Sequence, residues 1–337
     1  MKRVWSKILK NFGIFMLIVV IIMVPSILLS VYGPRQYKYD DNSFEWTYSV
    51  PEASESNIIF DQHSHTKYSD GILTVRQNIL WHIAHGFNAM VLTDHNNLRN
   101  SDDLQELALE YTSEFIIIQG MEWTTNRIHL NFLGISDWDL RIPWNPSDAQ
   151  IQEAINEAHS QGAVVTVNHI PWSLERMPNH PTRQQLLTWG VDYIEIVNGD
   201  DYDIDSDSWC NNTGGFGSIT GTDMHTPMNV KAWTLMNTTE FTADAIMNEL
   251  RARNTTIIYN TTGSVDLSKG YNNILYDIFS PFIYIGEYFE NFYANRITIP
   301  FFFSYLIAGF AGYTAIQYAI QKYKENKKRI PEKTEKK

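Results

Sequence analysis

Cysteine is almost absent from this chain of 337 residues, which contains only Cys210. One cysteine excludes an intrachain disulfide and every zinc site built from several cysteines. A nucleophile elbow is missing as well, because the stretch 217–221 has isoleucine at its centre and Cys210 lies among Asn and Gly residues. If the chain is an enzyme, we therefore expect it to work without a serine or cysteine nucleophile.

Basic residues are scarce in the middle of the chain. Residues 40–321 hold 12 Lys and Arg against 35 Asp and Glu, whereas residues 1–39 hold six basic residues and no acidic one. A region this acidic repels polyanions, so we do not expect long nucleic acid as a partner. Bound cations would offset part of the negative charge.

Charged residues are also absent from residues 11–34, which are mostly apolar. A helix of this length crosses a hydrocarbon core of about 30 Å at about 1.5 Å per residue. Four basic residues precede it, so we expect its N-terminus in the cytoplasm. The alternative is a cleaved signal peptide, but the apolar stretch is long for one and no Ala-x-Ala site follows.

A second uncharged stretch covers residues 297–321 and is followed at once by a basic tail. We expect a second transmembrane helix with its C-terminus inside; the alternative is an apolar helix packed on the folded domain. The expected protein is a two-pass protein of the cell membrane, in contact with the lipid bilayer. Both termini would be cytoplasmic and the acidic middle extracytoplasmic.

Histidine pairs with a carboxylate where an apolar run ends near residue 60. His63 and His65 follow this run, and Asp70 and Gly71 come shortly afterwards. Residues two apart on a strand point to the same side, so both imidazoles can face one point. Imidazole and carboxylate together suit a divalent ion such as Zn, Mn or Fe. On its own, this pattern is also compatible with surface histidines beside a turn.

The same arrangement recurs in five further apolar runs. Metal-ligand residue types lie in or just after these runs, and parallel α/β barrels place their chemistry at the carboxyl ends of strands. The residues concerned are Asp94 and His95, Glu122, His129, His169, and Asp223 with His225. We therefore predict a shared metal centre at one end of a barrel.

These motifs resemble the PHP (polymerase and histidinol phosphatase) superfamily of metal-dependent phosphoesterases. The matching pieces are His63-x-His65-x4-Asp70-Gly71, Thr93-Asp94-His95, Glu122, His129, Asn168-His169 and Gly221-Thr-Asp223-x-His225. The resemblance covers roughly residues 57–262 and implies an α/β fold, a distorted (β/α)7 TIM-like barrel. The stretch 192–199 looks most similar to the compact branch that includes carbaryl-hydrolase-type enzymes.

The resemblance also implies two or three divalent metal ions. One ion takes about four ligands, so nine candidate side chains are too many for one. By similarity to trinuclear sites, the first ion would take His63, His65, Glu122 and Asp223. The second would share Glu122 and add His129 and His169, and the third would take Asp70, His95 and His225. A bound hydroxide would then attack the substrate directly, without a covalent intermediate.

Two further residues are candidates for catalysis. Asp94 is expected to orient an imidazole or a bridging water, although a helix N-cap is the alternative. Arg127 lies between Glu122 and His129 in sequence and is a candidate for a bidentate phosphate contact. His82 and His85 are interpreted as packing or solvent-facing histidines. Trp123, Trp144, Trp172 and Trp209 are candidates for the wall of a substrate cleft, or for packing.

Helices are predicted over residues 74–84, 102–113 with Ser101 as N-cap, 147–161 and 240–253, alternating with strands. Such alternation favours a largely parallel sheet. The expected segments are a basic N-terminus (1–10), a transmembrane helix (11–34), a linker (35–56), the PHP metallohydrolase domain (57–262), an aromatic interfacial segment (263–296), a transmembrane helix (297–321) and a basic tail (322–337). Aromatic residues of the linker either meet the membrane interface or pack on the barrel.

The predicted function is hydrolysis of a small phosphoester or of a membrane-linked phosphodiester. Clustered cations suit phosphoryl oxygens, and relatives of this family mostly act on them. The alternatives are hydrolysis of a carboxylic or carbamate ester at the same site, or a metal-loaded module that binds a ligand without turnover.

Overall fold

The computed structural model describes residues 2–46, 48–53, 55–294 and 298–329. The chain divides into two compact units. The barrel unit comprises Tyr37–Asn272, and the helical unit comprises Met1–Gln36 with Asn273–Lys337. We describe each unit by itself.

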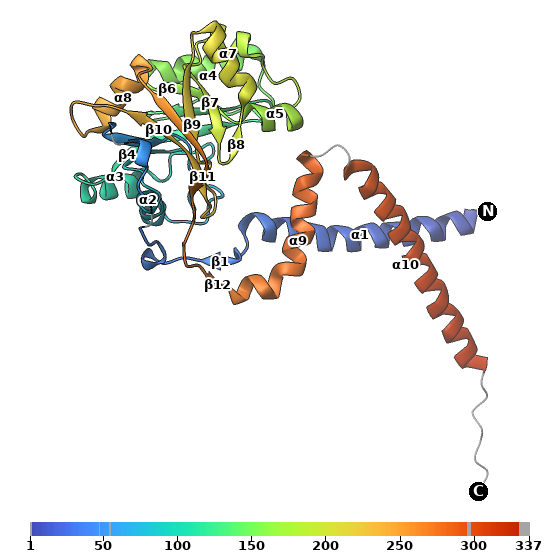
Figure 1. Ribbon diagram of the computed structural model, residues 1–337. Helices are drawn as coiled ribbons and strands as arrows, with labels where there is room; N and C mark the ends of the chain where they lie inside the picture. Colours follow the sequence, from blue (N-terminus) through green and yellow to red (C-terminus); the bar gives the residue numbers. More distant parts are fainter. Residues whose placement is uncertain (1, 47, 54, 295–297, 330–337) are drawn as a thin grey trace. The chain divides into compact units, whose positions relative to one another are not determined.

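A curled sheet forms the framework of the barrel unit (Figure 1). Its strand order is β11-β10-β2-β3-β4-β5-β6-β7-β8, and β9 pairs with β7. The strands are β2 (Ile58–Asp61), β3 (Ala89–Leu92), β4 (Ile116–Thr124), β5 (His129–Leu133), β6 (Val164–Val167), β7 (Tyr193–Asn198), β8 (Asp201–Tyr202), β9 (Gly217–Gly221), β10 (Val230–Met236) and β11 (Thr256–Ser264). The α/β class is therefore as predicted, and the curled sheet is consistent with a TIM-like barrel.

The sheet is mixed, so the expectation of a largely parallel sheet is wrong. β5 runs antiparallel to β4 and β6, and β10 runs antiparallel to β2 and β11. The connection from β4 to β5 has four residues, and a parallel crossover needs a dozen or more. Between β9 and β10, the Thr220 N–H donates to the Thr234 hydroxyl (2.9 Å). A side-chain contact thus joins these two strands.

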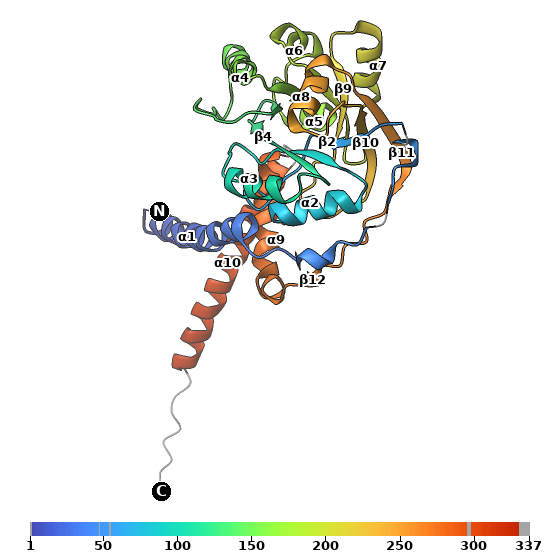
Figure 2. The same ribbon diagram turned by 90° about the vertical axis from the view of Figure 1, so that its left-hand side faces the viewer.

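Helices cover the outside of the sheet, and α2 and α3 lie next to each other there (Figure 2). They are α2 (Val75–Ala84), α3 (Ser101–Glu110), α4 (Asp148–Ser160), α5 (Ile170–Arg176), α6 (Arg183–Trp189), α7 (Ile204–Thr213) and α8 (Ala243–Ala252). Thr74 and Ser147 form capping boxes at the starts of α2 and α4. Ser101 is the first residue of α3 and Asn100 is its N-cap, so the prediction of Ser101 as N-cap is wrong; the Ser101 hydroxyl donates to the Leu98 carbonyl instead.

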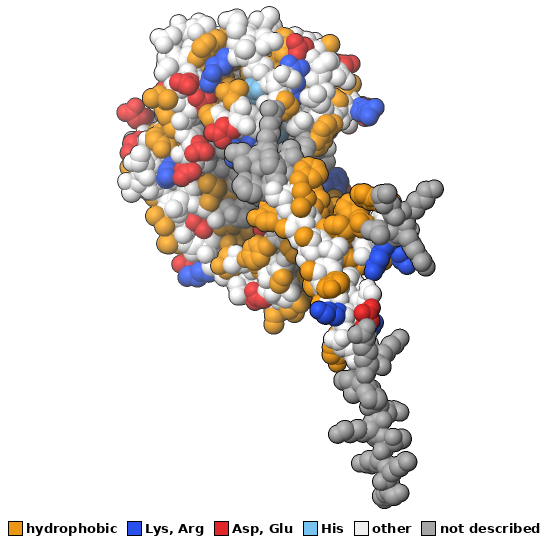
Figure 3. Space-filling model, turned by 90° about the vertical axis from the view of Figure 1, so that its right-hand side faces the viewer, with side chains coloured by type: hydrophobic (Ala, Val, Ile, Leu, Met, Phe, Trp, Pro, Cys, Tyr) orange, Lys and Arg blue, Asp and Glu red, His pale blue; other side chains and the backbone are white. Residues whose placement is uncertain are grey.

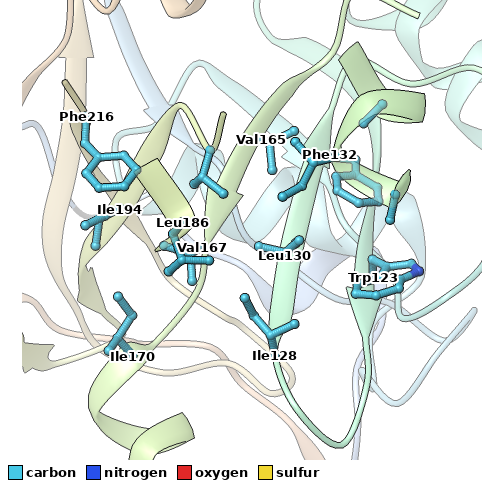
Figure 4. Packing of buried hydrophobic residues seen from close by; sticks show 14 of the residues in the cluster. Trp123, Ile128, Leu130, Phe132, Val165, Val167, Ile170, Leu186, Ile194 and Phe216 are labelled. Carbon is cyan, nitrogen blue, oxygen red and sulfur yellow. The ribbon is translucent and has the colours of Figure 1, made fainter. Parts of the chain in front are cut away.

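The core of the barrel unit is apolar and closely packed. Leu130 and Phe132 of β5 and Val165 and Val167 of β6 point into one buried cluster, in which Trp123 of β4 is 1% exposed (Figure 4). Burying a large apolar side chain stabilises a fold by about 1.5–3 kcal/mol. The antiparallel strand β5 is buried along its whole length, so it is held firmly where it delivers His129.

The described residues of the segment 37–53 (37–46 and 48–53) lie against the rest of the barrel unit. β1 (Tyr37–Lys38) pairs with β12 (Tyr271–Asn272), and short 3-10 helices cover Asp41–Ser43 and Pro51–Ala53. The Tyr48 ring stacks on Trp233 with ring centroids 5.4 Å apart. Of the two alternatives for the aromatic residues of this segment, packing on the barrel therefore holds for Tyr48.

The helical unit consists of α1 (Lys2–Tyr32), α9 (Ile274–Ala294) and α10 (Thr298–Arg329). Hydrophobic side chains are prominent on its visible surface (Figure 3). Within the described residues, one stretch, Trp5–Tyr32, is long and apolar enough to cross a membrane by length and composition. The second predicted span is therefore not confirmed. Part of it, Ile297, and the tail 330–337 lie outside the described residues, as do residues 295 and 296 of the predicted interfacial segment.

Candidate metal centre

The strands bring all nine predicted ligands to one region of the barrel unit. Asp70 and His95 lie on loops after β2 and β3, and Glu122 lies near the end of β4. Four groups have ligand atoms within 4.8 Å of one another: His65, Asp70, His95 and His225; His63, His65 and Glu122; His63, His169 and Asp223; and Glu122, His129 and His169. These groups share members, so the nine side chains form one continuous cluster.

His63 and His65 form the deepest part of this cluster. Both imidazoles are fully buried, and their Nε2 atoms lie 3.6 and 3.5 Å from Glu122 Oε2. Asp223 Oδ1 lies 3.3 Å from His63 Nε2 and 3.0 Å from His65 Nε2. Two imidazoles and two carboxylates thus converge on one point, as the i, i+2 spacing predicted.

Glu122 connects this point to the other groups. Its Oε1 lies 2.9 Å from His129 Nδ1 and 3.3 Å from His169 Nε2, while Oε2 lies 2.7 Å from His95 Nδ1. Because its two oxygens face different imidazoles, this carboxylate belongs to two of the four groups of candidate ligands.

Asp70, His95 and His225 form the exposed side of the centre. Asp70 lies 3.2 Å from His225 Nε2 and 3.5 Å from His95 Nε2. The side chains of Asp70, His225 and His95 are 48%, 34% and 24% exposed, whereas those of His63 and His65 are fully buried. This side is therefore the one that solvent reaches.

The buried ligand atoms fit a metal ion. His63 Nε2, both ring nitrogens of His65 and Glu122 Oε2 are buried without a hydrogen-bond partner among the described residues. Buried polar atoms in proteins are rarely left unpaired. A cation held by His63 Nε2, His65 Nε2 and Glu122 Oε2 would satisfy these three atoms at once, as in a divalent metal site.

The electrostatics of the centre also favour cations. Burial alone would raise the pKa of Glu122, but the imidazoles of His95 and His129 lower it well below its usual range. Burial lowers the pKa of His65 to about 4, helped by the neighbouring His225 and His95. Metal ligands must be deprotonated. An ionised Glu122 and a neutral His65 therefore match what an ion requires at neutral pH.

The pKa values of the other two carboxylates are also lowered by imidazoles. Burial opposes ionisation of Asp70 and Asp223, yet neighbouring imidazoles lower the pKa of both. Conversely, the carboxylates around His63 raise its pKa well above its usual value, although burial alone would lower it. The carboxylates therefore create a field that draws positive charge into the centre, whether a proton or a metal ion carries it.

Glu195 of β7 is part of the centre, although the sequence analysis did not assign it. Its Oε1 lies 2.9 Å from His63 Nδ1, and its Oε2 accepts a hydrogen bond from the His169 N–H (2.8 Å). A carboxylate that holds the far nitrogen of a ligand imidazole fixes the tautomer and the ring orientation. The available signal was a fully buried acidic residue inside an apolar strand.

Asp94 contacts the loop beside the centre. Its carboxylate accepts hydrogen bonds from the Thr66 N–H and hydroxyl, the Ser69 hydroxyl and the Asn100 amide. Ser69 precedes the ligand Asp70, so Asp94 holds the loop that presents this ligand. The predicted contact of Asp94 with an imidazole is not among these bonds, nor does Asp94 cap α3, since Asn100 occupies that position.

Arg127 is engaged by neighbouring loops. Its guanidinium donates to the carbonyls of Asn179 (2.7 Å) and Pro146 (3.1 Å) and forms an ion pair with Asp148. Its charge is thus partly neutralised, and a contact with phosphate remains a prediction.

His82 of α2 and His85, the C-cap of this helix, are buried and paired, which fits their interpretation as packing residues. His82 Nε2 lies 2.9 Å from Asp61 Oδ2, and His85 Nδ1 lies 2.6 Å from the Ser264 hydroxyl. Among the tryptophans, Trp123 is core, whereas Trp172 is 40% exposed. The Trp172 ring lies 5.0 Å from the ring of His169, at the edge of the centre.

Comparison with known proteins places this geometry in a family. No curated protein shows a significant match to the chain. A two-domain protein of Bacteroides vulgatus, containing a predicted PHP-like metal-dependent phosphoesterase, is 22% identical, with a TM-score of 0.50 over 67% of this chain and 68% of that protein. At this identity the likeness shows the fold alone.

Two further solved structures are more distant. A candidate metal-dependent phosphoesterase of Bifidobacterium adolescentis is 15% identical (TM-score 0.40, 50% of this chain, 87% of that one). An amidohydrolase of Chromobacterium violaceum is 16% identical (TM-score 0.38, 59% and 97%). The family assignment rests on the sequence, because residues 61–326 match the PHP domain. The chain therefore belongs to the PHP domain family.

Proposed function

We propose that this chain is a metal-dependent hydrolase that cleaves a phosphoester at the nine-residue centre. The observation that carries the proposal is the convergence of buried ligand atoms of His63, His65 and Glu122, which lie beside other candidate ligands but form no hydrogen bond among the described residues. Divalent ions bound there would supply a hydroxide near neutral pH and neutralise phosphoryl oxygens. Membership of the PHP family, and the description of the Bacteroides protein as a predicted phosphoesterase, support phosphoesters as the first substrates to test.

The residues of the centre divide the work by depth. His63 and His65 are the inner ligands. Both are buried, and contacts with Glu195 and Asp223 fix the positions of their rings. Asp70 and His225 are partly exposed, so a substrate would approach from their side. The substrate would be a small phosphoester or a membrane-linked phosphodiester, with two or three ions of Zn, Mn or Fe as cofactors.

The helical unit would anchor this enzyme in a membrane as a two-pass protein. Trp5–Tyr32 supplies one span by length and composition. α10 contacts α1 in antiparallel order: Lys7 donates to Gln321 (3.1 Å), and the rings of Phe12 and Phe310 are 5.3 Å apart. This pairing sets the basic ends of both helices on the same side, which supports cytoplasmic termini. In intact cells, an added protease should then leave both terminal tags intact; cleavage of either tag would contradict this topology.

The hydrolase proposal is tested on the purified full chain in detergent. We expect two to three metal ions per chain by elemental analysis, and turnover of p-nitrophenyl phosphate or of its diester. The double variant His63→Ala, His65→Ala should lose most of the metal and reduce turnover by more than about a hundredfold. His159→Ala is the matched control, because His159 pairs with Asp192 outside the centre, and it should keep both properties.

Other outcomes distinguish the alternatives. Turnover of p-nitrophenyl acetate alone would indicate a carboxylic ester hydrolase. Bound metal without turnover of any ester would indicate a binding module. A chain without metal, or an active double variant, would show that the assigned residues do not form the centre.

A further inference from the structure

One wall of the metal centre is formed by α5, the helix that starts directly after His169. Trp172 follows this ligand by three residues, and its ring centroid lies 5.0 Å from that of His169 and 5.6 Å from that of His129. The side chains of these two histidines are 8% and 10% exposed, whereas Trp172 is 40% exposed. The indole therefore covers the His129–His169 side of the centre, and the ring of His129 lies 6.1 Å from that of His95 on the exposed side from which substrate would approach.

Arg176 lies one turn further along α5, on the same side as Trp172. Its guanidinium carbon is 5.0 Å above the centre of the Trp172 ring. A cation over an indole face gains about 0.5–1 kcal/mol at exposed sites, and residues four apart on a helix are neighbours. Trp172 thus contacts the ligand imidazoles as well as Arg176, and the guanidinium rests over its ring with 37% of the arginine side chain exposed.

The charge of Arg176 is only weakly neutralised. Its ion pair is with the adjacent Glu175 at 3.2 Å, and that carboxylate is 76% exposed. Exposed pairs of this kind contribute about 0–1 kcal/mol. By contrast, Arg127 is held by Asp148 and two carbonyls, and Arg183 is held by Asp203 and Ser206. Of these three arginines, Arg176 is the one able to exchange its partner for a ligand.

An available cation at this position matters because the surrounding region is acidic. A phosphomonoester carries about −1.5 to −2 charges at neutral pH, since its second pKa is about 6, whereas a phosphodiester carries one. Ions at the centre would act on the oxygens of the scissile group in both. A guanidinium at the rim increases the affinity most for the ester with the additional charge. It can also donate two parallel hydrogen bonds to a phosphate.

We propose that Arg176, held in place by Trp172, is a specificity-determining residue that favours phosphomonoester dianions over phosphodiester monoanions. This inference rests on the proposed function and narrows its substrate class. Trp172 acts through Arg176 and is a positioning residue. The chemistry at the ions does not require either side chain.

The test compares Arg176→Gln with Arg251→Gln in the metal-loaded full chain. Arg251→Gln is the matched control, because this substitution removes the same charge at a position away from the centre. The Arg251 guanidinium donates to the Gly162 carbonyl, at the opposite end of β6 from His169. For p-nitrophenyl phosphate, Arg176→Gln should raise KM by about tenfold, the loss of a charge-assisted hydrogen bond, with kcat changed less than about threefold. For bis(p-nitrophenyl) phosphate the KM should change by less than about threefold. Trp172→Ala should also raise the KM for the monoester. The KM of Arg176→Lys should lie between those of the wild type and Arg176→Gln.

Equal effects of Arg176→Gln on both esters, or equal effects of the two arginine variants, would overturn the inference. Binding of inorganic phosphate, measured by calorimetry, gives a readout that does not need turnover. Its Kd should weaken about tenfold in Arg176→Gln and stay unchanged in Arg251→Gln. If the wild type binds phosphate through Arg176 but cleaves no phosphoester, the proposed function fails while Arg176 remains an anion receptor. An unchanged Kd in Arg176→Gln would refute the role of Arg176 whether or not the chain turns over.

Discussion

The candidate ligands are also held by residues that are not ligands themselves. Glu195 is fully buried, and its two oxygens are shared among Gln62, His63, the His169 backbone and Asn198. Such a carboxylate can orient a ligand without touching the ion. Its effect should appear in metal affinity rather than in the fold.

Glu195→Gln tests this role at the scale of one residue. The amide keeps the shape, but its oxygen accepts less strongly from His63 and its NH₂ group opposes the two donors around Oε2. We expect metal affinity to fall by about 10–100-fold, measured by competition with a chelator, while the metal-free chain unfolds at a similar temperature. Glu153→Gln, at an exposed position on α4, is the control and should leave affinity unchanged. An affinity like that of the wild type would show that the His63 ring is fixed by other contacts.

Secondary-structure elements are joined by polar contacts on the side away from the centre. Asp192 precedes β7, and its Oδ2 accepts from the Val165 N–H and from His159 Nε2, both at 2.9 Å. Its Oδ1 faces the Arg253 guanidinium at 3.3 Å. One carboxylate therefore links α4, β6 and the end of α8.

Asp192→Asn should lower the free energy of unfolding by about 1–3 kcal/mol at pH 7, because the charge-assisted bonds are lost. Burial alone would raise the pKa of Asp192, but His159, the Val165 N–H and Arg253 lower it. A carboxylate with a lowered folded-state pKa stabilises the fold above its unfolded pKa of about 3.9 and loses this contribution as pH falls. The difference in the free energy of unfolding between wild type and variant, measured by urea titration, should therefore become smaller below about pH 4. Asp205→Asn, on the exposed side of α7, should show no such difference; a difference for Asp192→Asn that persisted at low pH would assign the effect to packing.

The elements that could be predicted are those with local signals. α2 and α4 carry a hydroxyl N-cap followed by glutamine three residues on, and they begin where the pattern indicated. The short helices α5 and α6 have seven residues each, too few for a helical period to emerge. The direction of β5 could have been inferred from the four-residue loop before it, since length alone excludes a parallel crossover.

Site residues divide in the same way. The clustering of the nine candidate ligands could be predicted because histidine and carboxylate residues at strand ends are uncommon, and strand ends converge in an α/β barrel. Glu195 could not be predicted, because its contacts depend on which strand pairs with which. Trp172 was a candidate for the wall of a cleft, but its contact with Arg176 could not be predicted, because it depends on how α5 leaves β6. His169 starts that helix with a φ of 30°, a left-handed conformation that no local pattern around this residue indicates.

The whole molecule combines an acidic barrel unit with a helical unit whose termini are basic, and acidic side chains are scattered over the visible face of the barrel unit (Figure 3). Within the centre, three carboxylates and six imidazoles lie in a space where several ligand atoms have no partner among the described residues. Without metal ions, protons on the imidazoles must balance the ionised carboxylates, and the buried atoms that form no hydrogen bond remain unsatisfied. Metal binding should therefore contribute directly to the stability of the folded chain.

Chelation measures that contribution. A ligand that binds only the folded state at a hundred times its Kd stabilises it by about 2.7 kcal/mol. For a unit of this size, each kcal/mol of stability shifts the Tm by about 2–4 °C. EDTA should therefore lower the Tm of the full chain by roughly 5–10 °C. The His63→Ala, His65→Ala variant should unfold at nearly the same temperature with and without EDTA, because it has little metal to lose. If elemental analysis shows that EDTA empties the wild type and its Tm does not change, the nine side chains tolerate an empty centre. The missing partners of His63, His65 and Glu122 would then be supplied by ordered water, and the case for a preformed metal site would rest on the sequence match alone.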